Sequence, residues 1–188
     1  MKVVFVSGSP NKNGTTEALF DLIKSGLTDC EIISVNAGEV LSTAKYPFCL
    51  NCSAPCSEQC YKGTALEKAF DDIASSDFVV FGSPVYFGAV SAQLKAFFDK
   101  TRAIRGKKAW VGIPCAAVTS GGSKYGGQQA TVDDIHHMCL VQGMTVVGDS
   151  SVETGAGHFG LSSHRKDFDE YTLLRAKALS ERIMSFKK

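Results

Sequence analysis

The sequence predicts an α/β fold in which a parallel β-sheet carries helices on both faces. Apolar, β-branched runs of strand length alternate with amphipathic helical segments, and this alternation occurs five times along the 188 residues. Parallel strands need a long crossover, usually a helix, so the alternation is typical of such a sheet. The length suits one compact domain and no linker interrupts the pattern, so we expect residues 1–188 to form a single domain.

Five apolar runs are the predicted strands. They are largely continuous rather than alternating, as strands buried on both faces require. The first run ends at Ser7 and Gly8, and the third ends at Gly82, Ser83 and Pro84, which are turn-forming residues. In chain order the runs span residues 3–6, 31–35, 78–81, 109–118 and 145–147.

Each run precedes a segment with the spacing of a helix that buries one face. Between the second and third strands, positions i, i+3, i+4 and i+7 of this spacing are Leu66, Ala69, Phe70 and Ile73. The apolar stripes of the other four predicted helices lie within residues 18–27, 94–101, 132–139 and 173–186.

Two segments do not fit the alternation, residues 36–63 and residues 154–163. Long irregular segments in compact domains are often functional. The second is a loop rich in Gly and Ser. The first is a Cys-rich insert that holds four of the seven cysteines, namely Cys49, Cys52, Cys56 and Cys60.

The composition is that of an ordinary soluble protein, with a formal net charge of +1. Since there is no long block of like charge, we expect no nucleic-acid or membrane-surface partner. No apolar run approaches the length of a membrane span, and the run near Met1 is too short for a signal-peptide core. We therefore expect a cytoplasmic protein, in which clustered cysteines more often bind metal or do redox chemistry than form disulfides.

Three of the segments that follow strands are rich in small polar residues. They read SGSPNKNGTT after the first strand, GSPVYFGAVS after the third and TSGGSKYGG after the fourth. Doubly wound sheets bind ligands beyond the carboxyl ends of their strands. With the strand order 2-1-3-4-5, these three loops would meet in one crevice.

The first of these loops offers a site for a single phosphate group. Its N–H groups and hydroxyls lead into a helix N-terminus, which favours an anion without needing a cation. No Lys follows Gly14, as a nucleoside-triphosphate loop would require, and the glycines are wrongly spaced for a dinucleotide. The alternative is a plain helix cap. The residues concerned are Ser9, Asn11, Asn13, Gly14, Thr15 and Thr16.

The second and third loops suit a planar ring with a polar edge. Tyr86 and Phe87 could stack on such a ring, while Pro84 stiffens the turn before Val85. The alternative is an apolar plug over the end of the sheet. Four glycines within residues 119–127 could form a nest of backbone N–H groups that stabilises negative charge on the ring. For this segment the alternative is a flexible surface loop.

The sequence resembles the NAD(P)H-dependent FMN reductase family of the flavodoxin-like superfamily. The similar stretches are GSPNKNGTTEAL, SPVYFGAVSAQLKAFFD and TSGGSKYGGQ, within a likeness that covers roughly residues 2–148. The resemblance implies a flavodoxin-like three-layer sandwich with a five-stranded parallel sheet in the order 2-1-3-4-5. It also implies FMN as cofactor, NAD(P)H as co-substrate and a homodimer or homotetramer.

The resemblance assigns roles to residues of the three loops. Family members often carry Arg or Lys where Asn11 stands, so the neighbouring Lys12 becomes the candidate for that contact. The residues implied to hold the phosphate are Ser9, Asn11, Asn13, Thr15 and Thr16. Those implied to lie along the ribityl chain and ring are Pro84, Val85, Tyr86 and Phe87. Those implied to border the pyrimidine edge of the ring are Thr119, Ser120, Gly121 and Gly122.

The four clustered cysteines leave three interpretations open. Four thiolates on one short loop can surround a [4Fe–4S] cluster. Zinc is less natural, since its knuckles are normally a dozen or more residues apart, and simple or disulfide-bonded thiols are the third possibility. The placement of the motif resembles that of the iron–sulfur flavoproteins, a subset of the family. That subset usually has two residues between its second and third cysteines, whereas three separate Cys52 from Cys56.

Two functions of different classes follow from these patterns. The first is an FMN-dependent oxidoreductase that takes hydride from NAD(P)H and reduces a flavin, a quinone or another small acceptor, with no catalytic side chain of its own. The second is an iron–sulfur flavoprotein that carries electrons between FMN, a cluster at the four cysteines and a redox partner protein. A non-redox FMN-binding module is a third. The near-zero net charge favours the enzyme, since steered carriers need a strong field, whereas the cysteines favour the carrier.

Overall fold

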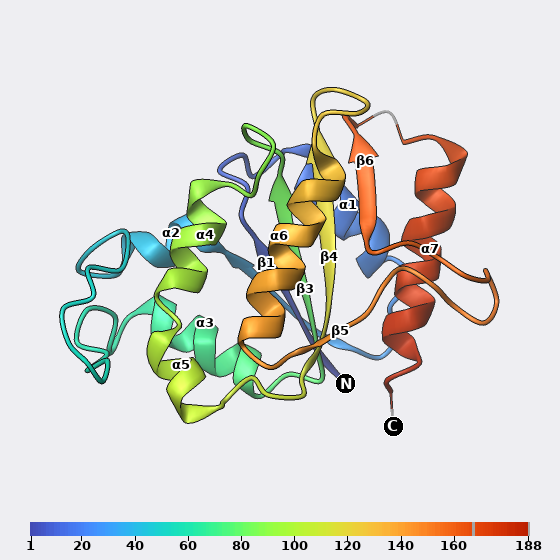
Figure 1. Ribbon diagram of the computed structural model, residues 1–188. Coiled ribbons are helices and arrows are strands. Elements are labelled where there is room, and N and C mark those ends of the chain that lie inside the picture. Colours follow the sequence, from blue (N-terminus) through green and yellow to red (C-terminus); the bar gives the residue numbers. More distant parts are fainter. Residues whose placement is uncertain (167, 188) are drawn as a thin grey trace.

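One parallel sheet organises the chain in the computed structural model, which describes residues 1–166 and 168–187 (Figure 1). Five strands lie in the order β2-β1-β3-β4-β5, and β6 pairs with a further stretch of β4. The predicted α/β fold and strand order are thereby confirmed. The strands are β1 (Lys2–Ser7), β2 (Glu31–Asn36), β3 (Phe78–Pro84), β4 (Pro114–Gly121), β5 (Thr145–Val146) and β6 (Leu161–His164).

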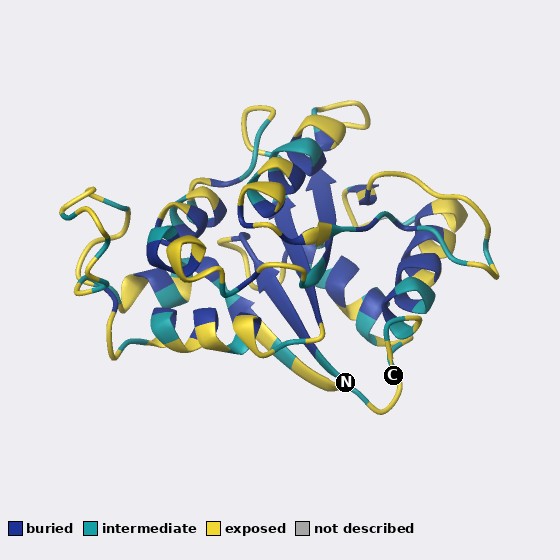
Figure 2. Cartoon of the chain, turned by 60° about the horizontal axis from the view of Figure 1, so that its bottom comes forward, coloured by how far each residue is buried: buried dark blue, intermediate teal, exposed yellow. Residues whose placement is uncertain are grey.

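Two helical layers cover the sheet. The helices are α1 (Thr15–Lys24), α2 (Ala37–Ser42), α3 (Ala65–Ala74), α4 (Ala92–Asp99), α5 (Arg102–Lys107), α6 (Gln128–Val141) and α7 (Glu170–Met184). Because successive strand residues point to opposite faces, Val4 and Val6 lie in a core shared with α3, α4 and α6. Val3 and Phe5 lie in a second core, shared with α1 and α7. Figure 2 shows the buried strands between the two layers. Across the described residues, the chain has no helix that is both long enough and apolar enough for a membrane span.

The outer edge of β4 is shared by two short strands. Strand β5 pairs with β4 at Cys115, and β6 pairs with it from Val118 onward. Between these strands the chain leaves the sheet. The prediction of a loop over residues 154–163 is therefore wrong at its end, where residues 161–163 belong to β6. A strand of four residues is too short to show a clear period in the sequence.

The observed strand β4 begins later than the predicted strand 109–118, because the chain turns to bury the indole of Trp110. Trp110 is fully buried among aromatic rings of α3, α4 and β3, and its Nε1 donates to the Phe70 carbonyl at 3.3 Å. The chain reaches this position from the end of α5 and passes through turns. As a result, β4 begins only at Pro114, and the predicted strand is wrong over its first residues.

Several helix boundaries also differ from the sequence pattern. Helix α4 ends at Asp99 and α7 at Met184, so Thr101 and Phe186 of the predicted stripes lie beyond them. The segment 36–63 begins with helix α2, which Asn36 caps by accepting from the Glu39 N–H at 3.1 Å. The rest of that segment is turns and bends, as expected of an insert. Helix α1 ends at Lys24, so Leu27 lies beyond it although its side chain still packs on the core.

A buried ion pair fastens the excursion between β5 and β6 to α7. Arg175 Nε donates to Asp149 Oδ2 at 2.9 Å, and Arg175 Nη2 lies 3.0 Å from Asp149 Oδ1. Both side chains are almost fully buried. Asp149 also accepts a hydrogen bond from the His158 N–H in the same excursion. The carboxylate is thus compensated from two sides, as a buried charge must be.

Arg175→Met should lower the free energy of unfolding by about 3–5 kcal/mol, because it leaves the Asp149 carboxylate buried without its partner. Lys177→Met on the same helix is the matched control. Its ion pair with Glu181, at 3.7 Å, involves a largely exposed lysine, so the effect should stay below about 1 kcal/mol. Urea unfolding followed by circular dichroism measures both variants. Equal effects would contradict an anchoring role for the buried pair.

Candidate flavin site and cysteine loop

Three loops meet above the carboxyl ends of β1, β3 and β4. We call them the first loop (between β1 and α1), the second loop (between β3 and α4) and the third loop (between β4 and α6). The Gly8 N–H donates to the Gly82 carbonyl at 2.7 Å, and the Ser91 hydroxyl donates to the Gly8 carbonyl at 2.6 Å. The Val85 N–H donates to the Ser120 carbonyl at 2.8 Å. Hydrogen bonds therefore join the first loop to the second and the second loop to the end of β4, at the edge where such sheets bind ligands.

Polar side chains of the first loop hold its own backbone. The Asn11 N–H donates to Ser9 Oγ at 3.1 Å, and the Asn13 N–H donates to Asn11 Oδ1 at 3.1 Å. Gly14 lies so close to this turn that a Cβ there would be 2.9 Å from the Asn11 carbonyl oxygen. The loop is therefore a tight turn, and α1 begins directly after it.

Two helices that begin at this edge have no side-chain cap within the described residues. They are α1, which follows Gly14, and α6, which follows Gly127. The neighbouring helices α2 and α4 are capped by Asn36 and Ser91. The first N–H groups of a helix have no intrahelical acceptor, and the helix dipole makes this end positive. At α1 these N–H groups, which include those of Thr15, suit a phosphate.

Thr16, in the first turn of α1, contacts the end of β4. Its Oγ1 lies 3.2 Å from Ser120 Oγ, and both residues are buried. Gly82 makes this approach possible, because a Cβ there would lie 2.4 Å from Phe20 Cζ and 2.9 Å from Thr16 Cγ2. A larger residue at this position would push α1 away from the sheet.

Two aromatic residues stand at the tip of the second loop. Tyr86 and Ala89 exchange backbone hydrogen bonds at 3.0 and 3.1 Å, and Phe87 between them has a φ of +51°. Phe87 is fully exposed and Tyr86 is 46% exposed, so neither forms an apolar plug over the sheet. A cavity of about 730 Å³ lies beside them, lined in part by Tyr86, Val90, Asp134, His137 and Met138.

Gln128 fixes the third loop from the start of α6. Its Oε1 accepts from the Gly126 N–H at 2.8 Å, and its Nε2 donates to the Ser123 carbonyl at 2.6 Å. It also packs on Gly121, where a Cβ would lie 2.6 Å from Gln128 Nε2. The glycines of this loop are therefore held by a defined side chain, which sequence analysis did not single out.

Asn36 is a second residue of the site that sequence analysis did not assign. Its Nδ2 donates to the Ser9 carbonyl at 2.9 Å, while its Oδ1 accepts from the Glu39 N–H at 3.1 Å. One side chain therefore joins the end of β2, the first loop and α2. Its position directly after a strand, at the same edge as the other loops, is the signal that could have identified it.

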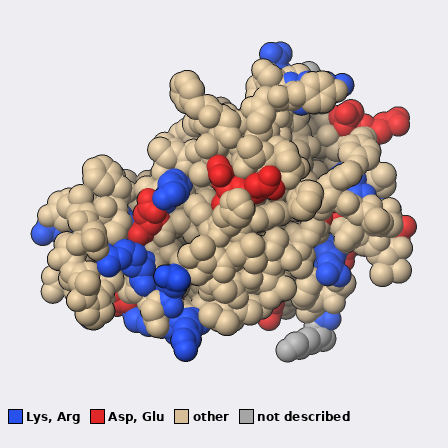
Figure 3. Space-filling view, in the orientation of Figure 1, with Lys and Arg blue, Asp and Glu red and all other residues tan. Residues whose placement is uncertain are grey.

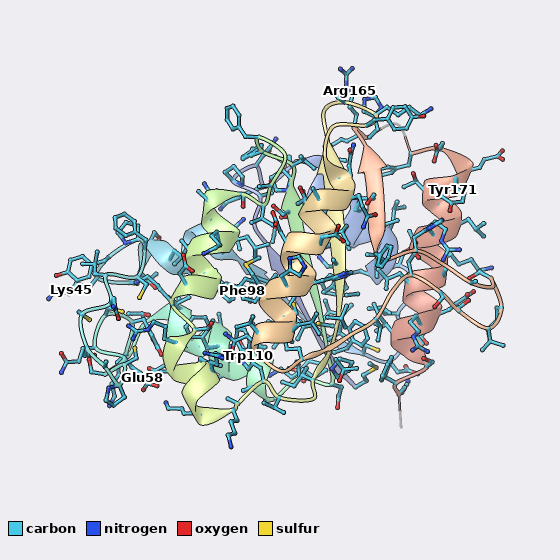
Figure 4. The ribbon with its side chains drawn as sticks, viewed as in Figure 1. Lys45, Glu58, Phe98, Trp110, Arg165 and Tyr171 are labelled. Carbon is cyan, nitrogen blue, oxygen red and sulfur yellow. The ribbon has the colours of Figure 1, made fainter. Side chains whose placement is uncertain are left out.

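The segment after β6 reaches two of the loops. His164 Nε2 lies 3.1 Å from the Gly122 carbonyl oxygen, and Arg165 Nε donates to the same oxygen at 3.2 Å. The next residue, Lys166, donates from Nζ to the Asn13 carbonyl of the first loop. Figure 4 shows Arg165 at this end of β6, beside the loop that follows β4. Three successive side chains therefore border the site.

The four cysteines of the insert lie on a separate loop beyond α2 and α3, away from the three loops (Figure 1). All four are free thiols, of which Cys52 is exposed and the others are partly buried. In the part of the chain that the structure describes, no three His, Cys, Asp or Glu side chains are arranged to hold a metal ion. The loop thus carries the thiols without gathering them around one point.

The surroundings of this loop suit a negatively charged sulfur group. Lys100 is only 2% exposed, and its Nζ lies 3.6 Å from Cys60 Sγ. A buried ammonium requires an anionic or strongly polar partner. The Tyr61 hydroxyl is buried with no hydrogen-bond partner in the described residues, and burial, with the nearby Glu58 carboxylate, raises the pKa of this phenol. Lys and Arg side chains also gather over the adjoining α5 (Figure 3). In its chemistry, this set of donors fits an iron–sulfur cluster.

The sheet order, the joined loops and the uncapped start of α1 define a flavodoxin-like fold. Comparison with known families shows to which family within this fold the chain belongs. The sequence profile described as NADPH-dependent FMN reductase matches residues 1–158. The chain therefore belongs to the NADPH-dependent FMN reductase family, a family of FMN-binding oxidoreductases.

Similar proteins extend over most of the chain. An iron–sulfur flavoprotein of Methanocaldococcus jannaschii is 32% identical, across 97% of this chain and 95% of that protein. An iron–sulfur flavoprotein of Methanosarcina thermophila is 33% identical, across 85% of this chain and 81% of that protein. The crystal structure of a flavodoxin, WrbA-like protein from Agrobacterium tumefaciens has a TM-score of 0.69 at 16% identity, covering 98% of this chain and 95% of that chain. At this identity the structural likeness shows the fold alone.

Asn36→Asp should weaken FMN binding while α2 stays capped. Asp caps a helix as well as Asn does, but a carboxylate cannot donate to the Ser9 carbonyl. Loss of this hydrogen bond, worth about 1 kcal/mol, should raise the FMN dissociation constant about fivefold. A titration followed by flavin fluorescence measures it. Asn36→Ala, which removes both contacts, should lose thermal stability as well; unchanged FMN affinity in both variants would contradict the assigned role.

Proposed function

We propose that this protein takes hydride from NADH or NADPH onto bound FMN and then reduces a flavin, a quinone or another small acceptor. The observation that carries the proposal is the uncapped start of α1, held by the first loop at the edge where three loops meet. Next to the second loop, a cavity of about 730 Å³ lined from α4 and α6 has the volume of a small-molecule site, and in this proposal it receives the co-substrate.

In this proposal the first loop binds the phosphate of FMN. The N–H groups of Thr15 and Thr16 at the start of α1 supply the donors, and the helix dipole favours the charge. Ser9 and Asn11 keep the loop in the conformation that presents these groups. The residues present therefore fit the phosphate, and they bind it through neutral donors.

The other two loops would orient the ring. Bound FMN would carry out the redox chemistry, accepting hydride and passing electrons to the acceptor. The protein therefore has to bind, position and shield it. Backbone N–H groups near Gly121 and Gly122, next to the uncapped start of α6, favour negative charge on the polar edge of the ring. The cavity lined by Tyr86, Val90 and Met138 offers an apolar face for the nicotinamide and then for the acceptor.

Thr15→Pro tests the proposal at one backbone N–H group. Proline is tolerated at the first position of a helix, and Gly14 already has the extended conformation that proline requires of the residue before it (φ −79°, ψ 177°). The change removes the N–H donor with little strain. We expect the wild type to oxidise NADH or NADPH steadily with a soluble quinone or free flavin. Thr15→Pro should need about tenfold more FMN for half-maximal turnover.

Thr15→Ala is the matched control, because it removes the hydroxyl and keeps the N–H group. Its requirement for FMN should stay close to that of the wild type. Absence of NAD(P)H oxidation by the FMN-loaded wild type would overturn the proposed reaction. Equal losses in the two variants would instead assign the effect to the hydroxyl and contradict phosphate binding by the backbone.

A second function is favoured by the contact between Lys100 and Cys60. We propose that Cys49, Cys52, Cys56 and Cys60 bind an iron–sulfur cluster, which would allow the protein to pass single electrons to a partner. The Lys100 ammonium and the orphaned hydroxyl on the next residue, Tyr61, could donate hydrogen bonds to its sulfur atoms. The names of the two relatives above support this assignment.

Anaerobically purified protein should contain about four iron and four sulfide per chain if the cluster is [4Fe–4S]. Cys52→Ser should lose most of the iron and keep its FMN. Cys30→Ser, which alters a partly buried thiol outside the insert, should keep both. Elemental analysis with acid-labile sulfide and flavin assays measures these contents. Zinc in place of iron, or no metal at all, would contradict the cluster.

A further inference from the structure

We propose that Lys166 supplies the positive charge that binds the phosphate of FMN, and that it makes the site select FMN over riboflavin. The inference rests on the FMN site proposed above and goes beyond it, since neutral donors alone were assigned there. A phosphate group of this kind carries a charge of about −1.5 to −2 near neutral pH, so a nearby cation adds substantially to its affinity.

The lysines within the loops are directed elsewhere. The first and third loops contain one lysine each, Lys12 and Lys124, and the second loop contains no Lys or Arg. Lys12, the candidate from the sequence, forms an ion pair with Glu39 of α2. Hydrogen bonding by the Thr172 N–H lowers the pKa of the Asp169 carboxyl, and the positive charge of Lys124 contributes to this shift. The ion pair engages Lys12 outside the site, and the charge of Lys124 adds to the positive potential at Asp169.

Lys166 reaches the first loop from the segment that follows β6. Its Nζ donates to the carbonyl of Asn13, which directly precedes Gly14 and the uncapped start of α1. An ammonium group has three donors, and the contact with Asn13 uses one of them. In this proposal the remaining donors face a phosphate bound at the start of α1, which Asn13 and Gly14 directly precede.

The position of Lys166 is set by β6 and the third loop. Strand β6 pairs in parallel with the end of β4, where Ser163 lies opposite Ser120. The Arg165 N–H donates to the Gly121 carbonyl at 3.2 Å, and Arg165 Nε donates to the Gly122 carbonyl at 3.2 Å. Arg165 has a φ of +58°, a left-handed conformation that turns the chain at this point. These contacts place the next residue, Lys166, between the third loop and the first.

This arrangement predicts a difference between two flavins. FMN carries the phosphate and riboflavin does not, while the ring and the ribityl chain are the same. Lys166→Gln should therefore weaken FMN binding about tenfold and leave riboflavin binding unchanged. The dependence of FMN affinity on salt should also become weaker, because one cation no longer faces the phosphate. Lys166→Arg should keep most of the FMN affinity.

Both dissociation constants are measured by quenching of flavin fluorescence, at two salt concentrations, for the wild type and three variants. Lys177→Gln on α7 is the matched control, because it removes one exposed lysine charge outside the three loops; its FMN affinity should change less than about twofold. Unchanged riboflavin affinity in Lys166→Gln shows that the variant is folded and its ring site intact.

Three results would overturn the inference. Wild-type affinity for FMN in Lys166→Gln would refute it while leaving the proposed FMN site in place. Equal losses for FMN and riboflavin would show that Lys166 supports the fold of the first loop and does not act on the phosphate. A wild-type protein that binds neither flavin would refute both the inference and the function on which it rests.

Discussion

Parallel hydrogen bonding among β1, β3 and β4 is the constraint on which the rest of this structure depends. Because these strands run in the same direction, the loops that follow them leave from one edge of the sheet. The bonds from Gly8 to Gly82 and from Val85 to Ser120 then hold the loops at fixed distances from one another. A shift of one residue in this register would exchange the two faces of each strand and separate the loops. The proposed flavin site is therefore a consequence of strand register.

The chain that pairs along the outer edge of β4 connects a stabilising ion pair with the proposed flavin site. Strand β5 pairs with only the first part of β4, which leaves the later part free for β6. The chain between them is anchored to α7 by the buried pair of Asp149 and Arg175. Its return as β6 brings His164 and Arg165 to the third loop and Lys166 to the first. A buried ion pair far from the first loop thus helps to determine which side chains border that loop.

Local charge distinguishes the flavin site from the cysteine loop better than the net charge of the chain does. The three loops offer mainly neutral donors, with backbone N–H groups and hydroxyls such as that of Thr16. The cysteine loop lies beside the buried Lys100 and near the Lys and Arg side chains that gather over α5 (Figure 3). A near-zero net charge conceals this separation, because it averages over the whole chain. The proposed phosphate site would thus rely on neutral donors with one added cation, Lys166, whereas the cysteine loop lies beside several cations.

The sequence by itself determined the α/β class and the places of the three loops, because buried strands and amphipathic helices leave periodic patterns in nearby residues. The strand order followed from the resemblance of the loop motifs to a known family. The sequence did not predict β6, the roles of Asn36 and Gln128, or the approach of Lys166 to Asn13. The pairing of β6 with β4 joins residues more than forty positions apart, such as Val118 and Leu161. A periodic pattern within one segment of the sequence does not reveal such a contact. Likewise, the first residues of the predicted strand 109–118 form turns, where the Trp110 side chain is buried. Tertiary packing decided these features, because each depends on which distant surface the chain meets.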